Sequence, residues 1–264
     1  MDTYYYILIF LIGLSVGSFF NVIIFRFDRP ATEVASPLRR RDSIIWGRSK
    51  CRNCDSIIKW FDLIPVLSYF FLKGKCRKCN SKISSLYPAT EILTAVVLTL
   101  FFLNASGTAF SMVINSVLIL SLVLILFLDI RYLTIPDKIL VVMAAAVFLL
   151  KLPENNLNLY SLVISSLGLV SFFAILFIAS KGRWIGLGDL KLIFIMGFLL
   201  EFPLNYFAVV LSVWTAAIFS IFLLITGRAT AKTEIPFGSF LSATAITFII
   251  FNHEVQEISQ YFYQ

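Results

Sequence analysis

Apolar residues run along this chain in long blocks that are separated by short polar turns. A helix needs about 20 apolar residues to cross the hydrocarbon layer of a bilayer. The blocks lie at roughly residues 4–25, 88–104, 108–128, 138–152, 160–180, 190–203, 204–226 and 236–251, and the fourth, sixth and eighth are short. The pattern predicts an all-α polytopic membrane protein with about eight transmembrane helices.

The composition changes this picture little. Of 264 residues, 59% are hydrophobic and 14% are charged, and the mean hydropathy is +0.90. These values are far from those of a soluble globular domain. The first apolar block follows Asp2 and precedes a basic loop, which is the reverse of a cleavable signal peptide.

The distribution of basic residues predicts the orientation, because lysine and arginine in short loops stay in the cytoplasm. Fourteen of the 22 lie between Arg26 and Lys82. With eight crossings and an external amino terminus, only Lys151 falls outside. The net charge of +7 then reflects topology and contact with the anionic lipid bilayer, and we expect no nucleic acid partner.

Residues 27–87 form the only sizeable polar insert, and they divide the chain into a first transmembrane helix (1–26), a cytoplasmic loop (27–87) and a membrane-embedded core (88–264). The insert holds two C-x-x-C pairs with 21 residues between them, which are Cys51, Cys54, Cys76 and Cys79. This spacing predicts a small cytoplasmic zinc-binding loop domain, and four thiolates make the zinc structural. Disulfides are the alternative, but they seldom persist in a reducing cytoplasm.

Two features of the insert and its border allow two interpretations each. The apolar stretch from Trp60 to Phe71 is too short to span a bilayer, so it either packs under the zinc site or lies in the membrane interface. Glu91, after Pro88, suits a helix amino terminus, and a catalytic part for it is the weaker interpretation. We recognise no internal repeat along the chain.

Two aspartates stand at the ends of apolar blocks. Asp129 ends the run 116–128, and Asp189 lies in Gly186-Leu187-Gly188-Asp189-Leu190-Lys191. An ionisable group there is costly unless it faces protein or water, so each is a candidate site residue; the alternative is a solvated charge at a helix end. Asp137 competes with Asp129 on spacing, and Lys191 is either a site cation or a cytoplasmic anchor.

Two carboxylates held close together share a proton. One can then act as general base on a water while the other polarises a carbonyl, which suits peptide hydrolysis without a covalent intermediate. His253 is the only histidine and is predicted to lie outside, which argues against a Ser-His site and excludes an H-E-x-x-H zinc site.

Several motifs in combination resemble those of bacterial type IV prepilin peptidases. They are Gly17-Ser18-Phe19-Phe20-Asn21 with Arg26, the two C-x-x-C pairs, Asp129 ahead of Ile135-Pro136-Asp137, the 186–191 hexapeptide and Ile235-Pro236-Phe237-Gly238. Presenilin-type proteases share G-x-G-D, but the cysteine loop and Lys191 point away from them. The chain has Ser239 and Arg52 where members often have proline.

The resemblance implies an aspartic endopeptidase of the bacterial inner membrane, with Asp129 and Asp189 as the catalytic pair facing the cytoplasm. Such enzymes remove the basic leader of type IV prepilin or pseudopilin precursors after a glycine. Members with the cysteine loop usually also methylate the new amino terminus with S-adenosylmethionine. The alternatives are a peptidase without methylation and a non-enzymatic membrane scaffold or carrier that uses the zinc loop.

Overall fold

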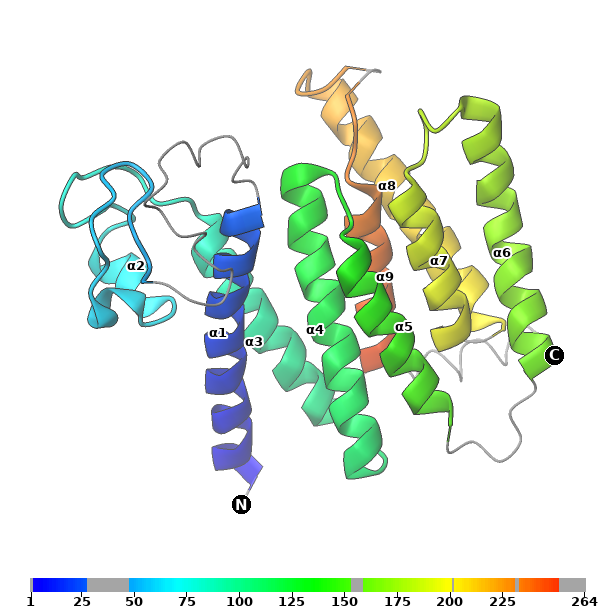
Figure 1. The fold of residues 1–264 in the computed structure, drawn as a ribbon, viewed down its shortest axis with the longest axis horizontal. Helices are drawn as coiled ribbons and strands as arrows, with labels where there is room; N and C mark the ends of the chain where they lie inside the picture. The colour runs from blue at the N-terminus through cyan, green and yellow to red at the C-terminus, as the bar shows by residue number, and fades with distance from the viewer. Residues whose placement is uncertain (1, 28–47, 153–158, 201, 231–232, 252–264) are drawn as a thin grey trace, which may run out of the picture. The chain divides into compact units, whose positions relative to one another are not determined.

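The computed structural model describes residues 2–27, 48–152, 159–200, 202–230 and 233–251 (Figure 1). Within these ranges the regular structure is helical apart from two isolated β-bridges. Part of the basic insert (28–47), Lys232 and His253 lie outside them, so the expectations on these residues stay predictions.

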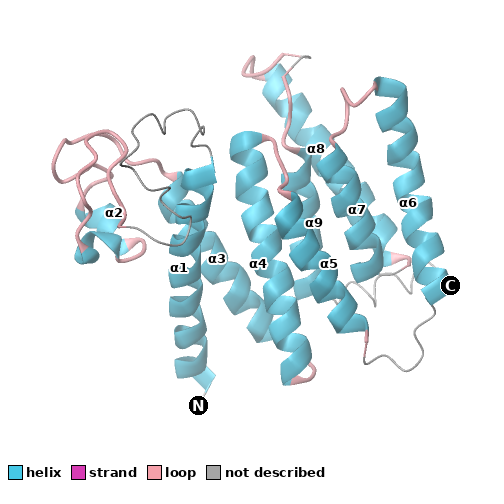
Figure 2. Ribbon diagram, in the orientation of Figure 1, coloured by secondary structure: helices cyan, strands magenta, loops and turns pink. Residues whose placement is uncertain are grey.

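A helix occupies each of the eight apolar blocks, which confirms the all-α prediction (Figure 2). The helix ends lie within a few residues of the block ends. The bounds are α1 Asp2–Phe27, α3 Leu86–Asn104, α4 Ala109–Tyr132, α5 Asp137–Lys151, α6 Leu159–Ser180, α7 Leu187–Leu200, α8 Leu204–Ile225 and α9 Phe237–Ile250.

The helices fall into two length classes. Five of those described contain a stretch long and apolar enough to cross a bilayer, namely Thr3–Phe27, Leu86–Asn104, Ala109–Tyr132, Leu162–Ser180 and Leu204–Ile225. By contrast α5, α7 and α9 have 15, 14 and 14 residues. At 1.5 Å per residue a 14-residue helix is about 21 Å long, short of the roughly 30 Å hydrocarbon layer. The chain is thus a multi-pass membrane protein with long and short apolar helices.

The chain divides into two compact units, residues 1–99 and 100–264, and α3 crosses their boundary. In the first unit α1 and α3 pack closely through small residues. A methyl group on Gly13 would lie 2.5 Å from the Cα of Ala95, and one on Gly17 would lie 2.6 Å from the Cα of Glu91. Glycines four residues apart let two membrane helices approach backbone to backbone.

The polar insert of the first unit contains two short helices, η2 Trp60–Leu63 and α2 Leu67–Phe71. Two contacts anchor it on the long helices. The Arg52 guanidinium donates to the carbonyl oxygen of Phe25 and lies 4.7 Å from the centre of its ring. The Val66 N–H donates to the carboxylate of Glu91 at 2.7 Å. The insert is therefore fixed to the adjoining ends of α1 and α3.

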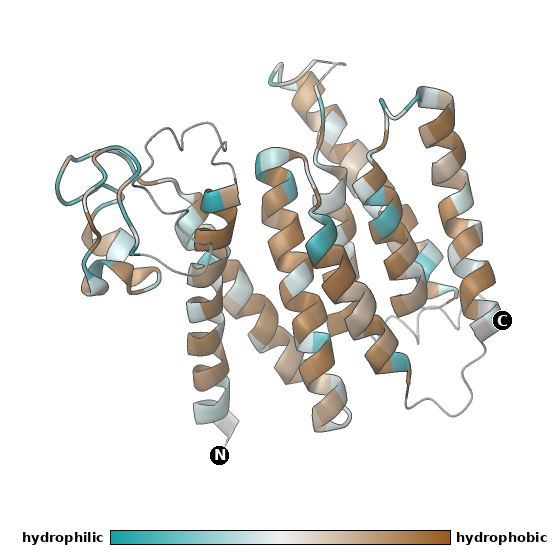
Figure 3. Ribbon diagram, in the orientation of Figure 1, coloured by the Kyte–Doolittle hydropathy of each residue, from teal (hydrophilic) through white to brown (hydrophobic). Residues whose placement is uncertain are grey.

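The second unit is a bundle in which α4 packs against α5 and α9, α6 packs against α7, and α8 packs against α9. Its core is largely apolar and includes Leu118, Ile119, Leu122, Ile125, Leu192, Ile193, Met196 and Leu241. α5 and α7 begin at the same end of this bundle, and their first turns are hydrophilic (Figure 3). That end carries the three aspartates considered in the sequence analysis, which are Asp129, Asp137 and Asp189.

Candidate functional site

Asp129 lies in the last turn of α4 and is only 4% exposed. α4 ends at Tyr132, because the next residue, Leu133, takes a left-handed conformation (φ 53°). The Leu133 N–H donates a hydrogen bond to the carbonyl oxygen of Asp129 at 2.9 Å. The Ser239 N–H, at the start of α9, donates to Oδ2 of Asp129 at 2.7 Å. One oxygen of the carboxylate is thus held by the backbone of a segment more than a hundred residues away in sequence.

Asp189 is the third residue of α7 and is partly buried. The N–H of Gly186, just before the helix, donates to its Oδ2 at 3.2 Å. An acidic side chain in this position caps the helix and interacts favourably with the helix dipole. The contact fixes the direction in which the carboxylate points.

The carboxylates of Asp129 and Asp189 both lie close to Gly238. A methyl group on Gly238 would lie 3.1 Å from Oδ1 of Asp189 and 3.2 Å from Oδ2 of Asp129. It would also lie 2.7 Å from Cδ1 of Ile135, in the turn between α4 and α5. The two carboxylate oxygens therefore lie beside the same residue, next to Ile135, at a position that has little room for a side chain.

Asp137 does not join this pair. Its carboxylate accepts a hydrogen bond from Nζ of Lys191 at 2.7 Å, and the side chains are 71% and 51% exposed. Of the two aspartates that compete on spacing, Asp129 is the one that meets Asp189. Lys191 ties the first turn of α7 to the first turn of α5.

Sequence reasoning identified both aspartates but only part of their surroundings. Gly238 belonged to a recognised motif, yet its position beside both carboxylates was not predicted. The Ser239 N–H donor and the Ile135 contact were missed. A backbone donor leaves no trace in a sequence, except that residue 239 here is not a proline and so keeps its N–H.

The four cysteines of the insert converge. Their sulfur atoms all lie within 4.8 Å of one another, and the sulfurs of Cys51 and Cys79 are 3.8 Å apart. Tetrahedral zinc with Zn–S bonds of 2.3 Å separates its sulfurs by about 3.8 Å. The cysteines are free thiols. The cluster has the ligand atoms and the dimensions that a zinc ion needs. The structure contains no disulfide among these four cysteines.

The two halves of the cluster are alike. The N–H of Cys51 bonds to Ser56 O and the N–H of Cys76 bonds to Ser81 O, both at 2.9 Å. Asp55 and Asn80 take the same left-handed conformation after the second cysteine, which Asp and Asn tolerate better than most residues. Hydrogen bonds from Ser81 lower the pKa of the Cys79 thiol to about 6, which favours the metal-binding thiolate. Sequence analysis missed this repeat, which reads Lys-Cys-Arg-x-Cys-Asp/Asn-Ser, because it is only seven residues long.

Glu91 is 6% exposed and its carboxylate is engaged within the first unit. It accepts hydrogen bonds from the Val66 N–H at 2.7 Å and from the Asn21 amide at 3.4 Å. Val66 has φ 62°, an uncommon value for a β-branched residue that a firm hydrogen bond helps to maintain. These contacts favour an anchoring role for Glu91 over a catalytic one.

Comparisons with known proteins divide the chain in the same way as its chemistry. The family model for the bacterial peptidase A24 N-terminal domain matches residues 11–105, which include the cysteine cluster. The model for the type IV leader peptidase family matches residues 116–221, which include Asp129 and Asp189. No solved structure matches the chain.

Curated relatives match over most of their length. A prepilin leader peptidase/N-methyltransferase of Bacillus subtilis is 29% identical, and the alignment covers 94% of this chain and 95% of the relative. An Escherichia coli protein named type 4 prepilin-like proteins leader peptide-processing enzyme is 31% identical, with 90% of both chains covered. A prepilin leader peptidase/N-methyltransferase of Aeromonas salmonicida is 29% identical, with 90% of this chain and 88% of the relative covered.

Proposed function

Because the chain belongs to the type IV leader peptidase family, we propose that it is a membrane aspartic endopeptidase that removes the basic leader of type IV prepilin-like precursors after a glycine. The single observation that carries the proposal is the meeting of two carboxylates at Gly238. The motif match alone would leave Asp137 as a rival, and the geometry favours Asp129.

In the proposed reaction Asp129 and Asp189 share one proton and hold a water in the space beside Gly238. The ionised carboxylate takes a proton from the water as it attacks the scissile carbonyl, and the protonated partner donates to the carbonyl oxygen. When the tetrahedral diol collapses and its C–N bond breaks, the protonated carboxyl gives its proton to the leaving amine, and a hydroxyl of the diol gives one to the other carboxylate, which restores the shared proton. The Ser239 and Gly186 N–H groups keep both carboxylates in place throughout.

We extend the proposal to a structural zinc ion and to methyl transfer. Cys51, Cys54, Cys76 and Cys79 would hold the zinc, and four thiolates leave no position for a reacting water. The names of two of these relatives include N-methyltransferase. On that ground the new amino terminus is the methyl acceptor, and S-adenosylmethionine would supply the methyl group.

The proposal includes the topology predicted from charge. All eight long or short apolar helices cross the inner membrane, with the amino terminus outside and the carboxylate pair facing the cytoplasm. The functional division into a first helix (1–26), a zinc loop (27–87) and a peptidase core (88–264) goes with it. The alternating directions of α4 to α9 in the bundle support this arrangement.

The test is cleavage of a purified prepilin in liposomes by the wild type and by Asp129→Asn, Asp189→Asn and Asp137→Asn. We expect the first two changes to slow cleavage by about 1,000-fold or more, since each removes one half of the acid–base pair. Asp137→Asn is the matched control, because it removes an exposed carboxylate beside the same turn. Near wild-type cleavage by either of the first two variants would favour the scaffold or carrier alternative.

A further inference from the structure

The polar insert carries an exposed apolar surface of unusual density. Every residue of η2 and α2 is at least partly exposed, and Trp60, Phe70 and Phe71 are 78%, 66% and 82% exposed. We call the set the aromatic face; its members are Ile57, Trp60, Leu63, Ile64, Leu67, Phe70 and Phe71. An exposed apolar patch of this kind marks a docking surface for a protein or a membrane.

Cations surround the aromatic face. Residues 48–85 contain nine exposed Lys and Arg and only two Asp, and one of these, Asp62, is paired with Arg77 at 2.7 Å. The remaining positive charge attracts anionic surfaces. It repels both the basic leader of a precursor and the net cationic S-adenosylmethionine, so neither suits this surface.

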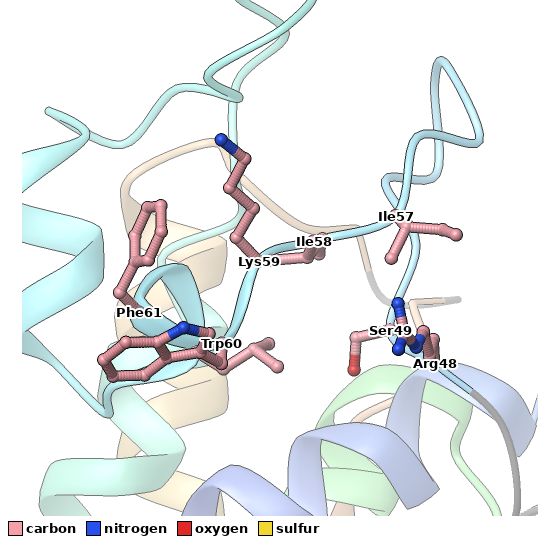
Figure 4. A pocket seen from close by; sticks show the side chains of 8 residues that line it. Arg48, Ser49, Ile57, Ile58, Lys59, Trp60 and Phe61 are labelled. Carbon is pink, nitrogen blue, oxygen red and sulfur yellow. The ribbon is translucent and has the colours of Figure 1, made fainter.

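A pocket of about 510 Å³ lies within the face. Figure 4 shows Arg48 on one side of it and Lys59 and Trp60 on the other. Ile57, Ile58, Phe61 and Leu63 complete the apolar part of its lining. Arg48 and Lys59 point to different sides of the pocket (Figure 4), and the Lys59 ammonium lies 5.5 Å from the centre of the Phe61 ring. An apolar and aromatic surface with cations at its edges fits the headgroup region of a lipid bilayer.

The anchoring contacts fix the depth of this surface. Val66, in the middle of the aromatic face, bonds to Glu91, which is five residues beyond the start of α3 at Leu86. Five residues correspond to about 7.5 Å along the helix, which is about the thickness of one headgroup layer. With the start of α3 at the outer edge of the headgroups, Ile64 and Leu67, on either side of Val66, lie near the boundary between headgroups and hydrocarbon.

We propose that the aromatic face is a docking surface for an anionic phospholipid bilayer, with Arg48 and Lys59 each directed to a lipid phosphate at its edge. The aromatic side chains rest at the headgroup boundary, where Trp and Phe of interfacial segments reside. The zinc loop is then a membrane-bound platform. This inference goes beyond the peptidase proposal and does not depend on it.

Trp60 is the probe for the test. The full-length protein with Trp46→Phe, Trp184→Phe and Trp214→Phe is reconstituted at a low protein-to-lipid ratio into phosphatidylglycerol vesicles that contain brominated lipids. We expect blue-shifted Trp60 emission and stronger quenching by bromines near the headgroup than by bromines near the chain ends. A matched protein that keeps only Trp214, in α8, reports a residue inside the bilayer.

Charge reversal tests the phosphate contact. Arg48→Glu with Lys59→Glu should reduce the Trp60 quenching in phosphatidylglycerol vesicles at least twofold and have little effect in phosphatidylcholine. Arg228→Glu, an exposed cation in another polar loop, should leave it unchanged. Unquenched, water-like Trp60 emission in the wild-type loop would overturn the proposal. So would shielding of Trp60 that depends on protein density, since a second copy would then cover the face.

Discussion

At the scale of single residues, the candidate site depends on a glycine, because position 238 has little room for a side chain. Gly238 lies beside both carboxylates, and the Ser239 N–H next to it holds Asp129. The residue types of the pair could be predicted from the sequence, because a carboxylate at the end of an apolar block is costly without a function. The crowding at Gly238 and the backbone donors could not, because they arise only when α4, α7 and α9 come together.

Replacing Gly238 with alanine tests this dependence. The added methyl group would lie 2.7 Å from Cδ1 of Ile135 and 3.1 and 3.2 Å from Asp189 and Asp129, so the Ile135 side chain must shift and each carboxylate must give by a few tenths of an ångström. We expect cleavage to slow by about tenfold, since a misplacement of about 1 Å at a reacting centre costs about a hundredfold and the shift here is a fraction of that. The measurement is the cleavage rate of a prepilin per folded enzyme.

Gly168→Ala is the matched control for this change. Its methyl group would meet only the hydroxyl end of Tyr206, a side chain that can move. A Gly238→Ala enzyme that cleaves as fast as Gly168→Ala would contradict the role assigned to the space beside Gly238.

At the scale of elements, the positions and lengths of the apolar blocks predicted the helices well. All eight apolar blocks are helices, including the three short ones. The insert was less predictable. Its stretch from Trp60 to Phe71 forms two short helices that do not bury their aromatic side chains, because Arg52 and Val66, rather than an apolar core, fix the loop on α1 and α3.

The paired knuckles of the insert predict how zinc is lost. Each knuckle supplies half of the sulfur ligands, so Cys54→Ser and Cys79→Ser should be equally damaging. We expect the purified wild type to contain one zinc ion per chain, and each variant to retain about a tenth of that or less, since a serine hydroxyl is a poor ligand in place of a thiolate.

Metal content by atomic absorption and the rate of proteolysis within the loop are the two measurements. Ser84→Ala, near the end of the same loop, should keep its zinc. A metal-free wild type that resists proteolysis as well as the zinc-loaded protein would mean that the ion does not stabilise the loop.

At the scale of the whole molecule, the predicted eight-helix layout depends on charge as much as on hydropathy. Length alone identifies five spans among the described helices, and the basic loops are what argue for eight. The sequence predicted three parts, 1–26, 27–87 and 88–264, whereas the two family models meet between residues 105 and 116. The division into compact units at residue 99 could not be predicted, because no polar linker marks it.

The three short helices predict that lipid chain length controls the rate. Cleavage of a water-soluble leader peptide should be about threefold faster in bilayers with 14-carbon acyl chains than with 20-carbon chains of the same headgroup, since thick bilayers must deform around short helices. A soluble substrate keeps the thickness dependence of a precursor's own helix out of the measurement. Equal rates, after normalisation to the rate in detergent, would contradict the prediction.

The shortness of α5, α7 and α9 has a consequence for how a hydrolase obtains water inside a lipid environment. Each of these helices begins at the end of the bundle that carries the carboxylates, and 14 residues fall about 9 Å short of a full hydrocarbon layer. We expect a bilayer to become thinner where it meets such short helices, and this thinning to bring headgroups and their hydration shell toward the two aspartates. On that expectation the water of the proposed reaction arrives from a depression in the membrane and needs no channel through the protein.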